Sequence, residues 1–502
     1  MSVLRHHALG EAVPASRHAV CCSLPTLDAV IGYEEKRPDV MSRLQAGYPR
    51  FLRHNLINQL AATLAVREGW SGLAVHPVLS HAHAEALIHY CGSTDARLAE
   101  QDGYYAVGLP DDETSILRAR AFLQHTGGLV STRLAEDRLD AAGLVDNRQP
   151  EVIWAGETDP ASQVKQELGC IGCMDTRDIR LYASGMGAFY AAYSAISRTR
   201  AREGRDLWIQ WGWLYVDTMR ILERLAPQGS QSITLLAVHD FKELEAVLGK
   251  YGSRVAGLVT EVPTNPLLQT TDLPRLAALT RRHGITLVVD PTLASPRNVT
   301  VFPWADVMVN SLTKYAGNQG DVLAGALMLN PESPWYNELS EALIHAPETA
   351  YVRDLARLAH TMQDYARVVE VSNRNTLALV EYLQSHPAIA RVHWTGSPAS
   401  KPFYDVVSDS TTRPGAVFTI ELNKPLAEFY DRMRGVKGPS FGVVFTLLCP
   451  FMYLAHYDQV TQAEGRRHLL AHGLNPELVR VSMGTEPAAA IMDAFAEALG
   501  AV

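Results

Sequence analysis

Strand-like and helical runs alternate from about residue 168 to residue 311, and this alternation constrains the fold more than any other feature of the chain. Amphipathic helical segments separate short apolar runs that are rich in β-branched residues. These strand-like runs stand at 206–213, 232–238, 255–262, 285–290 and 307–311. Such alternation is typical of a mainly parallel sheet flanked by helices. We therefore predict an α/β fold.

The pattern changes on both sides of this region and divides the chain into three parts. Residues 1–165 should form an N-terminal arm followed by a helical insertion, in which short strand-like runs occur but no motif for chemistry stands out. Residues 166–345 hold the alternating pattern and should form a large domain. Residues 346–502 begin with long helical segments and continue as mixed strands and helices, which predicts a smaller C-terminal α+β domain.

The composition excludes several classes of protein. A chain of 502 residues with 47% hydrophobic and 20% charged residues is ordinary for a folded globular protein. A formal charge of −9 gives no basic surface for nucleic acid or an anionic membrane. No apolar run approaches the roughly 18 residues of a membrane span, and "MSVLRHHALG" has no signal-peptide core. We expect a cytoplasmic protein without nucleic-acid or membrane partners.

Two short patterns resemble metal sites, but we predict no metal. Cys170 and Cys173 form a lone "CIGC" without a second pair, and the six cysteines are too scattered for a disulfide framework, so they should be reduced. His81 and His83 lack a third ligand at a suitable spacing and should be polar residues at a helix start.

A lysine follows the last strand-like run of the alternating region. Val307–Val309 predict a buried strand, and Ser311, Thr313 and Lys314 come where that strand emerges from the sheet. Open α/β folds bind their ligands at this edge. A lysine amine can attack an aldehyde to form a Schiff base, and the two hydroxyls can hydrogen-bond a phosphate. Together they indicate pyridoxal 5'-phosphate (PLP).

Further polar side chains stand at strand ends in the same region. Asp290 ends an apolar strand, where its carboxylate could pair with a pyridinium nitrogen and keep the ring an electron sink. Asn265 follows another strand and could bond a ring hydroxyl, while Tyr215 could stack on the ring. Single occurrences of such residues have ordinary structural explanations, but their order and spacing favour a shared site.

A helix start completes this set. Ser184, Gly185 and Met186 precede a predicted helix, whose free N–H groups and dipole would hold a phosphate.

The whole set resembles the cystathionine γ-synthase family of PLP enzymes, also called the Cys/Met metabolism family, of fold type I. Five motifs carry the resemblance in the family's order, and it covers about residues 165–500. The motifs are Ser184-Gly185-Met186, Tyr215-Val216-Asp217-Thr218, Glu261-Val262-Pro263-Thr264-Asn265-Pro266, Val289-Asp290-Pro291-Thr292 and Ser311-Leu312-Thr313-Lys314-Tyr315.

The resemblance implies a role for each matching residue. Lys314 would be the Schiff-base lysine and Tyr215 a stacking and catalytic residue. Arg480, in "LVRVSMGTE", would hold the substrate carboxylate, with Ser440 nearby. The remaining cofactor contacts would be Ser184, Gly185, Met186, Asn265, Asp290, Thr292, Ser311 and Thr313.

The resemblance also predicts how subunits share the site. In this family a Y-x-R pair from a neighbouring subunit contacts the cofactor phosphate, and "GYPRF" offers Tyr48 and Arg50. We therefore expect a homodimer or homotetramer with an active site shared between subunits. Residues 55–165 separate this pair from the other motifs and should be an insertion.

Some positions depart from the family pattern. Phe445 stands where cystathionine-handling members have a glutamate that recognises an ammonium group, so we predict that Phe445 contacts the substrate and disfavours cysteine. Asp217 replaces a glycine beside the stacking tyrosine, and Pro291 replaces an asparagine.

The activity that this resemblance implies is γ-substitution on an O-activated L-homoserine, such as the acetyl or succinyl ester, through a vinylglycine-type ketimine. The expected partners are an amino-acid substrate and a small nucleophile: a thiol, a carbon acid or an amine. Two alternatives in the family stay open, namely a cystathionine γ-synthase that uses cysteine and a γ- or β-lyase of sulfur amino acids. A third reading is a catalytically silent homologue, which the intact Lys314 and Asp290 disfavour.

Overall fold

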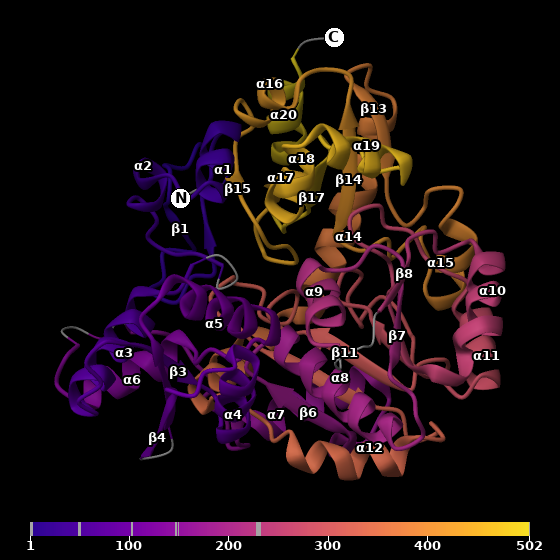
Figure 1. Ribbon diagram of the computed structural model, residues 1–502. Coiled ribbons are helices and arrows are strands. Elements are labelled where there is room, and N and C mark those ends of the chain that lie inside the picture. Colours follow the sequence, from indigo (N-terminus) through magenta and orange to yellow (C-terminus); the bar gives the residue numbers. More distant parts are fainter. Residues whose placement is uncertain are drawn as a thin grey trace.

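The computed structural model describes residues 4–48, 52–101, 104–145, 148, 150–226 and 232–500. It contains a seven-stranded sheet, a five-stranded sheet, a three-stranded sheet and a two-stranded pair. Figure 1 shows the seven-stranded sheet in the lower part of the molecule, the five-stranded sheet at the top and the three-stranded sheet at the lower left.

The seven-stranded main sheet confirms the predicted α/β fold. Its strands follow the order β6 (Ile179–Tyr182), β12 (Gly325–Leu329), β11 (Val307–Ser311), β10 (Thr286–Asp290), β9 (Val255–Glu261), β7 (Leu207–Trp211) and β8 (Ile233–Leu235). The sheet is mainly parallel, but β12 pairs antiparallel with both β11 and β6. The chain returns from β11 to β12 without a crossover helix, and such a return gives an antiparallel pair.

Alternate residues of the main sheet enter two different hydrophobic clusters. Val307 and Val309 of β11 pack in one cluster with helix α8, whereas Met308 between them packs in the larger cluster on the opposite face. Helix α8 (Gly185–Ala201) crosses β6, β9, β11 and β12. This burial on both faces explains why the strands are apolar throughout. The other helices of this region are α7 (Pro160–Gly172), α9 (Val216–Arg224), α10 (Phe241–Tyr251), α11 (Leu273–Arg282) and α12 (Tyr336–Ala342).

The C-terminal part is a smaller α+β unit, as predicted. Its sheet has the order β13 (Ile389–His393), β14 (Val417–Leu422), β17 (Val479–Ser482), β16 (Leu447–Cys449) and β15 (Val436–Lys437). Its helices are α13 (Val352–Met362), α14 (Tyr365–Gln384), α15 (Lys401–Val407), α16 (Leu426–Tyr430), α17 (Phe451–Ala455), α18 (Tyr457–Val460), α19 (Ala463–Ala471) and α20 (Ala488–Leu499).

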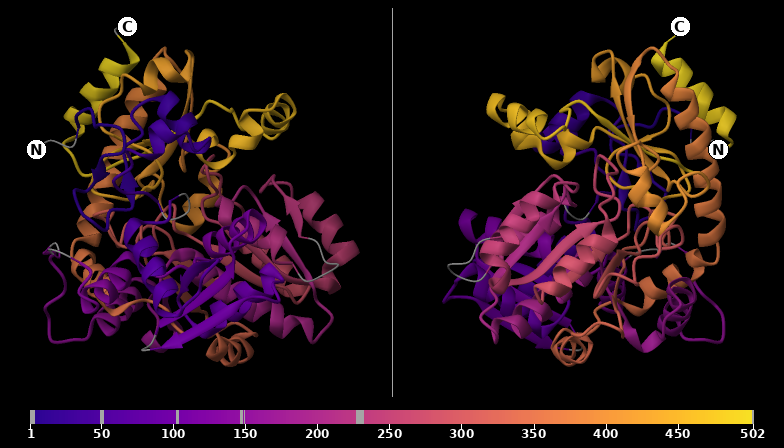
Figure 2. Two further views of the ribbon diagram at one scale, coloured as in Figure 1. Left: turned by 60° about the vertical axis from the view of Figure 1, so that its left-hand side comes forward. Right: turned by 90° about the vertical axis from the view of Figure 1, so that its right-hand side faces the viewer.

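The N-terminal arm, residues 4–48, packs into the main hydrophobic core. Its apolar side chains join the main cluster, and its backbone is hydrogen-bonded from Leu24 N to Lys437 O over 2.8 Å. Both views in Figure 2 show the arm against the C-terminal part. Its elements are β1 (Ala12–Val13), β2 (Cys21–Cys22), α1 (Leu27–Glu34) and α2 (Pro38–Met41).

Residues 52–145 form what we call the N-terminal unit. The prediction of a helical insertion missed its antiparallel sheet, in which β5 lies between β3 and β4. The sequence of this unit contains only short strand-like runs among longer helical patterns, so the helical patterns dominated the prediction. Helix α5 of the unit packs on α8 and α9 of the large domain. Its elements are α3 (Asn55–Arg67), β3 (Leu73–Val78), α4 (His81–Cys91), β4 (Arg97–Gln101), β5 (Tyr104–Pro110), α5 (Glu113–Thr126) and α6 (Thr132–Ala141).

The short cysteine and histidine patterns lie at helix ends. The six cysteines are free, and Cys170 and Cys173 are exposed at the end of α7. His81 begins α4, and the His83 ring is hydrogen-bonded to Ser80, which caps that helix. Within the described ranges, no three His, Cys, Asp or Glu side chains are grouped to hold a metal, and no helix has the length and apolarity to cross a bilayer.

Candidate active site

One open cavity lies where the large domain, the C-terminal unit, the arm and the N-terminal unit meet. It encloses about 1810 Å³ of empty space, open solvent at its mouth included. The predicted site residues that line it are Tyr48, Ser184, Gly185, Met186, Tyr215, Asn265, Asp290, Thr292, Ser311, Thr313, Lys314, Ser440 and Arg480. The structure thus brings together residues that are far apart in the sequence.

Lys314 projects into this cavity just after β11. Its Nζ lies 3.1 Å from the Tyr48 hydroxyl and 3.1 Å from the Ser440 hydroxyl. The rings of Tyr48 and Phe441 stand 4.6 and 4.9 Å from the same nitrogen. The lysine is 6% exposed. Its amine is therefore held in a defined position by two hydroxyls and two aromatic faces.

Ser440 links the lysine to the predicted carboxylate site. Its carbonyl oxygen accepts a hydrogen bond of 3.0 Å from Arg480 Nη2, while its hydroxyl contacts Lys314. The residue has φ +111°, a backbone conformation that side chains other than glycine rarely adopt. Such strain persists where the surrounding structure fixes it, often at functional sites.

Arg480 lies on β17 and is buried beside the lysine. Its Nη1 donates to Asn265 Oδ1 over 3.1 Å, and its guanidinium stands over the rings of Phe441 and Phe451. Burial lowers the pKa of Arg480 from its usual value, but a guanidinium keeps its charge in proteins. Its planar fork fits a carboxylate in two parallel hydrogen bonds.

Two carboxyl groups stand side by side at the ends of neighbouring strands. Asp290 on β10 is paired in register with Glu261 on β9. Burial raises the pKa of Asp290 to about 6. Burial and the neighbouring Asp290 raise the pKa of Glu261 well above its usual value. A buried acid pair favours a cation beside it, and a protonated pyridinium nitrogen is such a cation.

The start of helix α8 forms the other half of a cofactor cradle. Ser184 caps the helix by accepting from Gly187 N over 3.0 Å. A Cβ on Gly185 would lie 2.7 Å from Ser311 Cβ, so only glycine allows this close approach of helix and strand end. Thr292 Oγ1 accepts from Ser311 N over 2.9 Å and holds that strand end. Free N–H groups of a helix N-terminus beside hydroxyls fit a phosphate, and the residues present therefore fit PLP.

The sequence places Asp217 beside Tyr215, but the contacts that the cavity wall makes with the N-terminal unit were not predicted. Asp217 in the first turn of α9 is 1% exposed, and its Oδ1 lies 2.8 Å from His125 Nδ1 and 3.2 Å from Gln124 Nε2. Gly127 packs on the start of α8, where a Cβ would lie 2.2 Å from Ser184 Oγ. The N-terminal unit therefore forms one wall of the site, and no local pattern in its sequence signals these contacts.

Of the predicted Y-x-R pair, Tyr48 belongs to the described residues. Tyr48 reaches Lys314 of its own chain, so the geometry does not require a neighbouring subunit to supply this hydroxyl. Arg50 lies outside the described residues.

Phe445 is not brought to the site. It is 4% exposed and is not among the described residues that line the cavity. Its ring packs near Gly320, close to Val443 and Pro14. The backbone turns through Ser440 at φ +111° and Gly442 at φ +69°, so spacing from Ser440 does not predict which later side chain faces the cavity.

A buried lysine after a sheet strand, an acid pair at neighbouring strand ends and a helix N-terminus that fits a phosphate are the arrangement expected of a PLP-dependent enzyme of fold type I. Comparison with known proteins agrees. Residues 158–500 match the model of the Cys/Met metabolism PLP-dependent enzymes. The chain therefore belongs to this cystathionine γ-synthase-like family.

Individual relatives extend the similarity to the N-terminal unit. The chain is 36% identical to L-2-amino-4-chloropent-4-enoate dechlorinase/desaturase from Streptantibioticus cattleyicolor, with 97% of each chain covered. It is 26% identical to cystathionine γ-synthase from Neurospora crassa, with 98% of each covered. A crystal structure of cystathionine γ-synthase from Xanthomonas oryzae pv. oryzae in complex with cystathionine shares the fold. Its TM-score is 0.60 at 22% identity, with 70% of this chain and 89% of that chain covered.

Proposed function

We propose that this enzyme expels a leaving group from Cγ of an L-amino acid, with PLP as cofactor and Lys314 as the group that moves protons. The observation that carries this proposal is the bridge through Ser440, whose hydroxyl contacts Lys314 and whose carbonyl contacts Arg480. An amino acid whose carboxylate binds Arg480 would place its Cα within reach of the lysine amine.

The residues of the chain divide the work as follows. PLP, when bound, supplies the electron sink for negative charge that develops at Cα. The Asp290 carboxylate would hold the protonated pyridine nitrogen. Lys314 would remove the proton from Cα and then one from Cβ, so that the leaving group departs from Cγ with its bonding electrons. Tyr215, which lines the same cavity, would donate a proton to the leaving group.

The first candidate reaction is replacement on an O-activated L-homoserine, such as the acetyl or succinyl ester, by a small thiol, carbon acid or amine. The similarity to cystathionine γ-synthases supports this substrate class. The placement of Phe445 away from the cavity provides no basis for rejecting cysteine, so cysteine is one of the nucleophiles to compare.

A second candidate is elimination without a nucleophile. The relative with 36% identity is named as a dechlorinase of an amino acid that carries chlorine at C4, and C4 is Cγ. Loss of a γ leaving group followed by release of the unsaturated product would begin with the same proton transfers. Both candidates therefore use the same lysine and the same carboxylate site.

The test is a substrate panel with the purified holoenzyme. O-acetyl-L-homoserine, O-succinyl-L-homoserine and L-2-amino-4-chloropent-4-enoate are each incubated with and without cysteine, small thiols, amines and carbon acids, and products are identified by mass. Replacement products support the first candidate, and unsaturated or keto-acid products without a nucleophile support the second. Turnover of amino acids with a leaving group at Cβ alone would contradict the proposal.

A further inference from the structure

Arg53 is a cation on the cavity wall for which the described chain provides no counter-charge. It lies shortly after Tyr48, at the start of the N-terminal unit, and lines the cavity. Its Nη2 donates to the carbonyls of Val75 over 3.0 Å and Ile57 over 3.5 Å. Its Nε is buried and finds no hydrogen-bond acceptor among the described residues. No carboxylate in the described ranges forms an ion pair with it.

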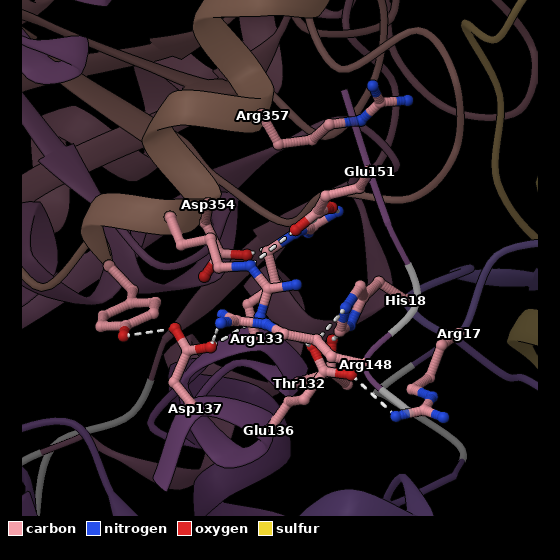
Figure 3. A network of polar contacts seen from close by, with 12 residues as sticks. Arg17, His18, Thr132, Arg133, Glu136, Asp137, Arg148, Glu151, Asp354 and Arg357 are labelled. Atoms are coloured by element: carbon pink, nitrogen blue, oxygen red, sulfur yellow. Dashed lines mark hydrogen bonds and ion pairs between the residues drawn. The ribbon is translucent and has the colours of Figure 1, made fainter. Parts of the chain in front are cut away.

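The adjoining charge cluster shows how this protein compensates the charges of two buried arginines. Arg133 is ion-paired with Glu151 and Asp354 at 2.8 and 3.1 Å, and these residues appear together in Figure 3. Arg353 is paired with Glu136 at 2.7 Å. Arg53 is half-buried, and its Nε is fully buried without an acceptor among the described residues. Because a charge that is partly removed from water is costly when it is unpaired, the difference at Arg53 indicates that its counter-charge comes from outside the described chain.

The described surroundings of Arg53 add no negative charge. Burial lowers the pKa of Arg53 to about 10, which still leaves it charged at neutral pH. Burial, with the charge of Arg53, lowers the pKa of His76 to about 4, so this neighbour is neutral. Helix α3 begins at Asn55, and its N-terminal dipole adds partial positive charge at the same place.

We propose that Arg53 is the anchor of an anion-binding subsite in this cavity, which takes a phosphate or carboxylate group carried in by the cofactor or by the substrate. The subsite lies on the wall formed by the N-terminal unit, whereas Arg480 lies on the C-terminal sheet. A ligand with two anionic ends could therefore be held by both units. The substrate half of this inference rests on the proposed function; the cofactor half does not.

The experiment compares full-length wild type with Arg53→Gln, Arg53→Lys and the control Arg67→Gln. Arg67 is an exposed arginine at the end of helix α3, the helix that follows Arg53, and it is already paired with Glu68 at 2.6 Å. Melting of the cofactor-free chain is first measured with and without inorganic phosphate or succinate. Wild type and Arg67→Gln should be stabilised by at least one of these anions, Arg53→Gln should not, and Arg53→Lys should recover part of the effect.

Two further arms identify the source of the anion. If the cofactor phosphate is the ligand, Arg53→Gln should lose about tenfold or more in affinity for PLP but not for pyridoxal, which lacks the phosphate. If a substrate carboxylate is the ligand, the ratio of kcat/KM for the succinyl over the acetyl ester should fall about tenfold. The anion and pyridoxal measurements remain informative when neither ester is a substrate.

The inference is overturned if Arg53→Gln keeps the anion-dependent stabilisation and both ratios stay within about twofold of wild type. A lower melting temperature in every condition, with unchanged anion response, would show that Arg53 is only a structural residue.

Discussion

His125 Nδ1 lies 2.8 Å from Asp217 Oδ1, and the two side chains are 7% and 1% exposed. This contact joins the last turn of α5, in the N-terminal unit, to the first turn of α9, in the cofactor domain. Tyr215 is the N-cap residue immediately before α9. The N-terminal unit is thus tied to the residue that we expect to stack on the cofactor.

We predict that this pair positions Tyr215 for cofactor binding. His125→Leu would remove one hydrogen-bond donor from the buried Asp217, at a cost of about 1–3 kcal/mol. The free energy of PLP binding should become less favourable by a similar amount. His125→Asn can place an amide N–H near the lost ring nitrogen and should retain most of the affinity. PLP titration of the cofactor-free variants measures this, and equal, wild-type affinities in both would exclude a positioning role.

Arg480 should act on the substrate and not on the cofactor. Arg480→Ala removes the buried guanidinium that would bind the carboxylate. The resulting drop in kcat/KM should correspond to a loss of about 2–5 kcal/mol in transition-state stabilisation. The absorbance spectrum of bound PLP should stay nearly unchanged. Steady-state kinetics with a spectrum of each preparation test this. Normal kinetics once the variant is saturated with PLP would place the carboxylate elsewhere.

PLP affinity should rise with pH through the titration of Asp290. In the cofactor-free protein burial raises the pKa of Asp290 to about 6 from an ordinary 3.8. The same shift makes the cofactor-free fold less stable as the pH rises from about 3.8 to about 6, because in this range the unfolded chain has released the Asp290 proton and the folded chain still holds it. A pyridinium nitrogen binds the ionised form, so affinity should increase from pH 5 and level off above about 6. In the control Asp290→Asn, any change of PLP affinity with pH comes from the titration of PLP itself. If wild type and Asp290→Asn show the same pH profile, Asp290 is not the group that binds the pyridine nitrogen.

The charge cluster between the N-terminal unit and the C-terminal part should stabilise the fold. Glu136 is fully buried and contacts Arg17 at 2.9 Å and Arg353 at 2.7 Å (Figure 3). Glu136→Ala removes one carboxylate from Arg17 and from Arg353, but Arg353 keeps Asp137 and Glu151 as partners. The loss should therefore be about 3 kcal/mol in the free energy of unfolding, the low end for a broken buried pair. Glu245→Ala, which breaks an exposed pair with Arg275, should cost less than about 1 kcal/mol. Urea denaturation compares them, and equal losses would show that the cluster contributes little.

The residues that sequence reasoning placed correctly in the cavity lie at strand ends or helix starts. Lys314, Asp290 and Ser184 are examples, since parallel strands and the helices after them bring such positions to one edge of the sheet. The local sequence pattern around each of these residues is therefore enough to predict its place at the edge of the sheet.

Contacts between distant segments could not be predicted in this way. His125 and Asp217 belong to separate units, and neither stands in a pattern that specifies its partner. The same holds for Arg53, whose importance depends on the absence of a carboxylate within the described structure. Phe445 does not line the cavity, and the left-handed turns at Ser440 and Gly442 could not be predicted from the spacing of the motif.

The central claim is that Lys314 moves protons at Cα and Cβ before a leaving group departs from Cγ. The most direct measurement is deuterium incorporation from D₂O into substrate and product, located by mass spectrometry, for wild type and Lys314→Ala saturated with PLP. Wild type should incorporate deuterium at both Cα and Cβ as the leaving group is released, and the variant at neither. Loss of the γ leaving group without exchange at Cβ, or unchanged exchange in Lys314→Ala, would contradict the account.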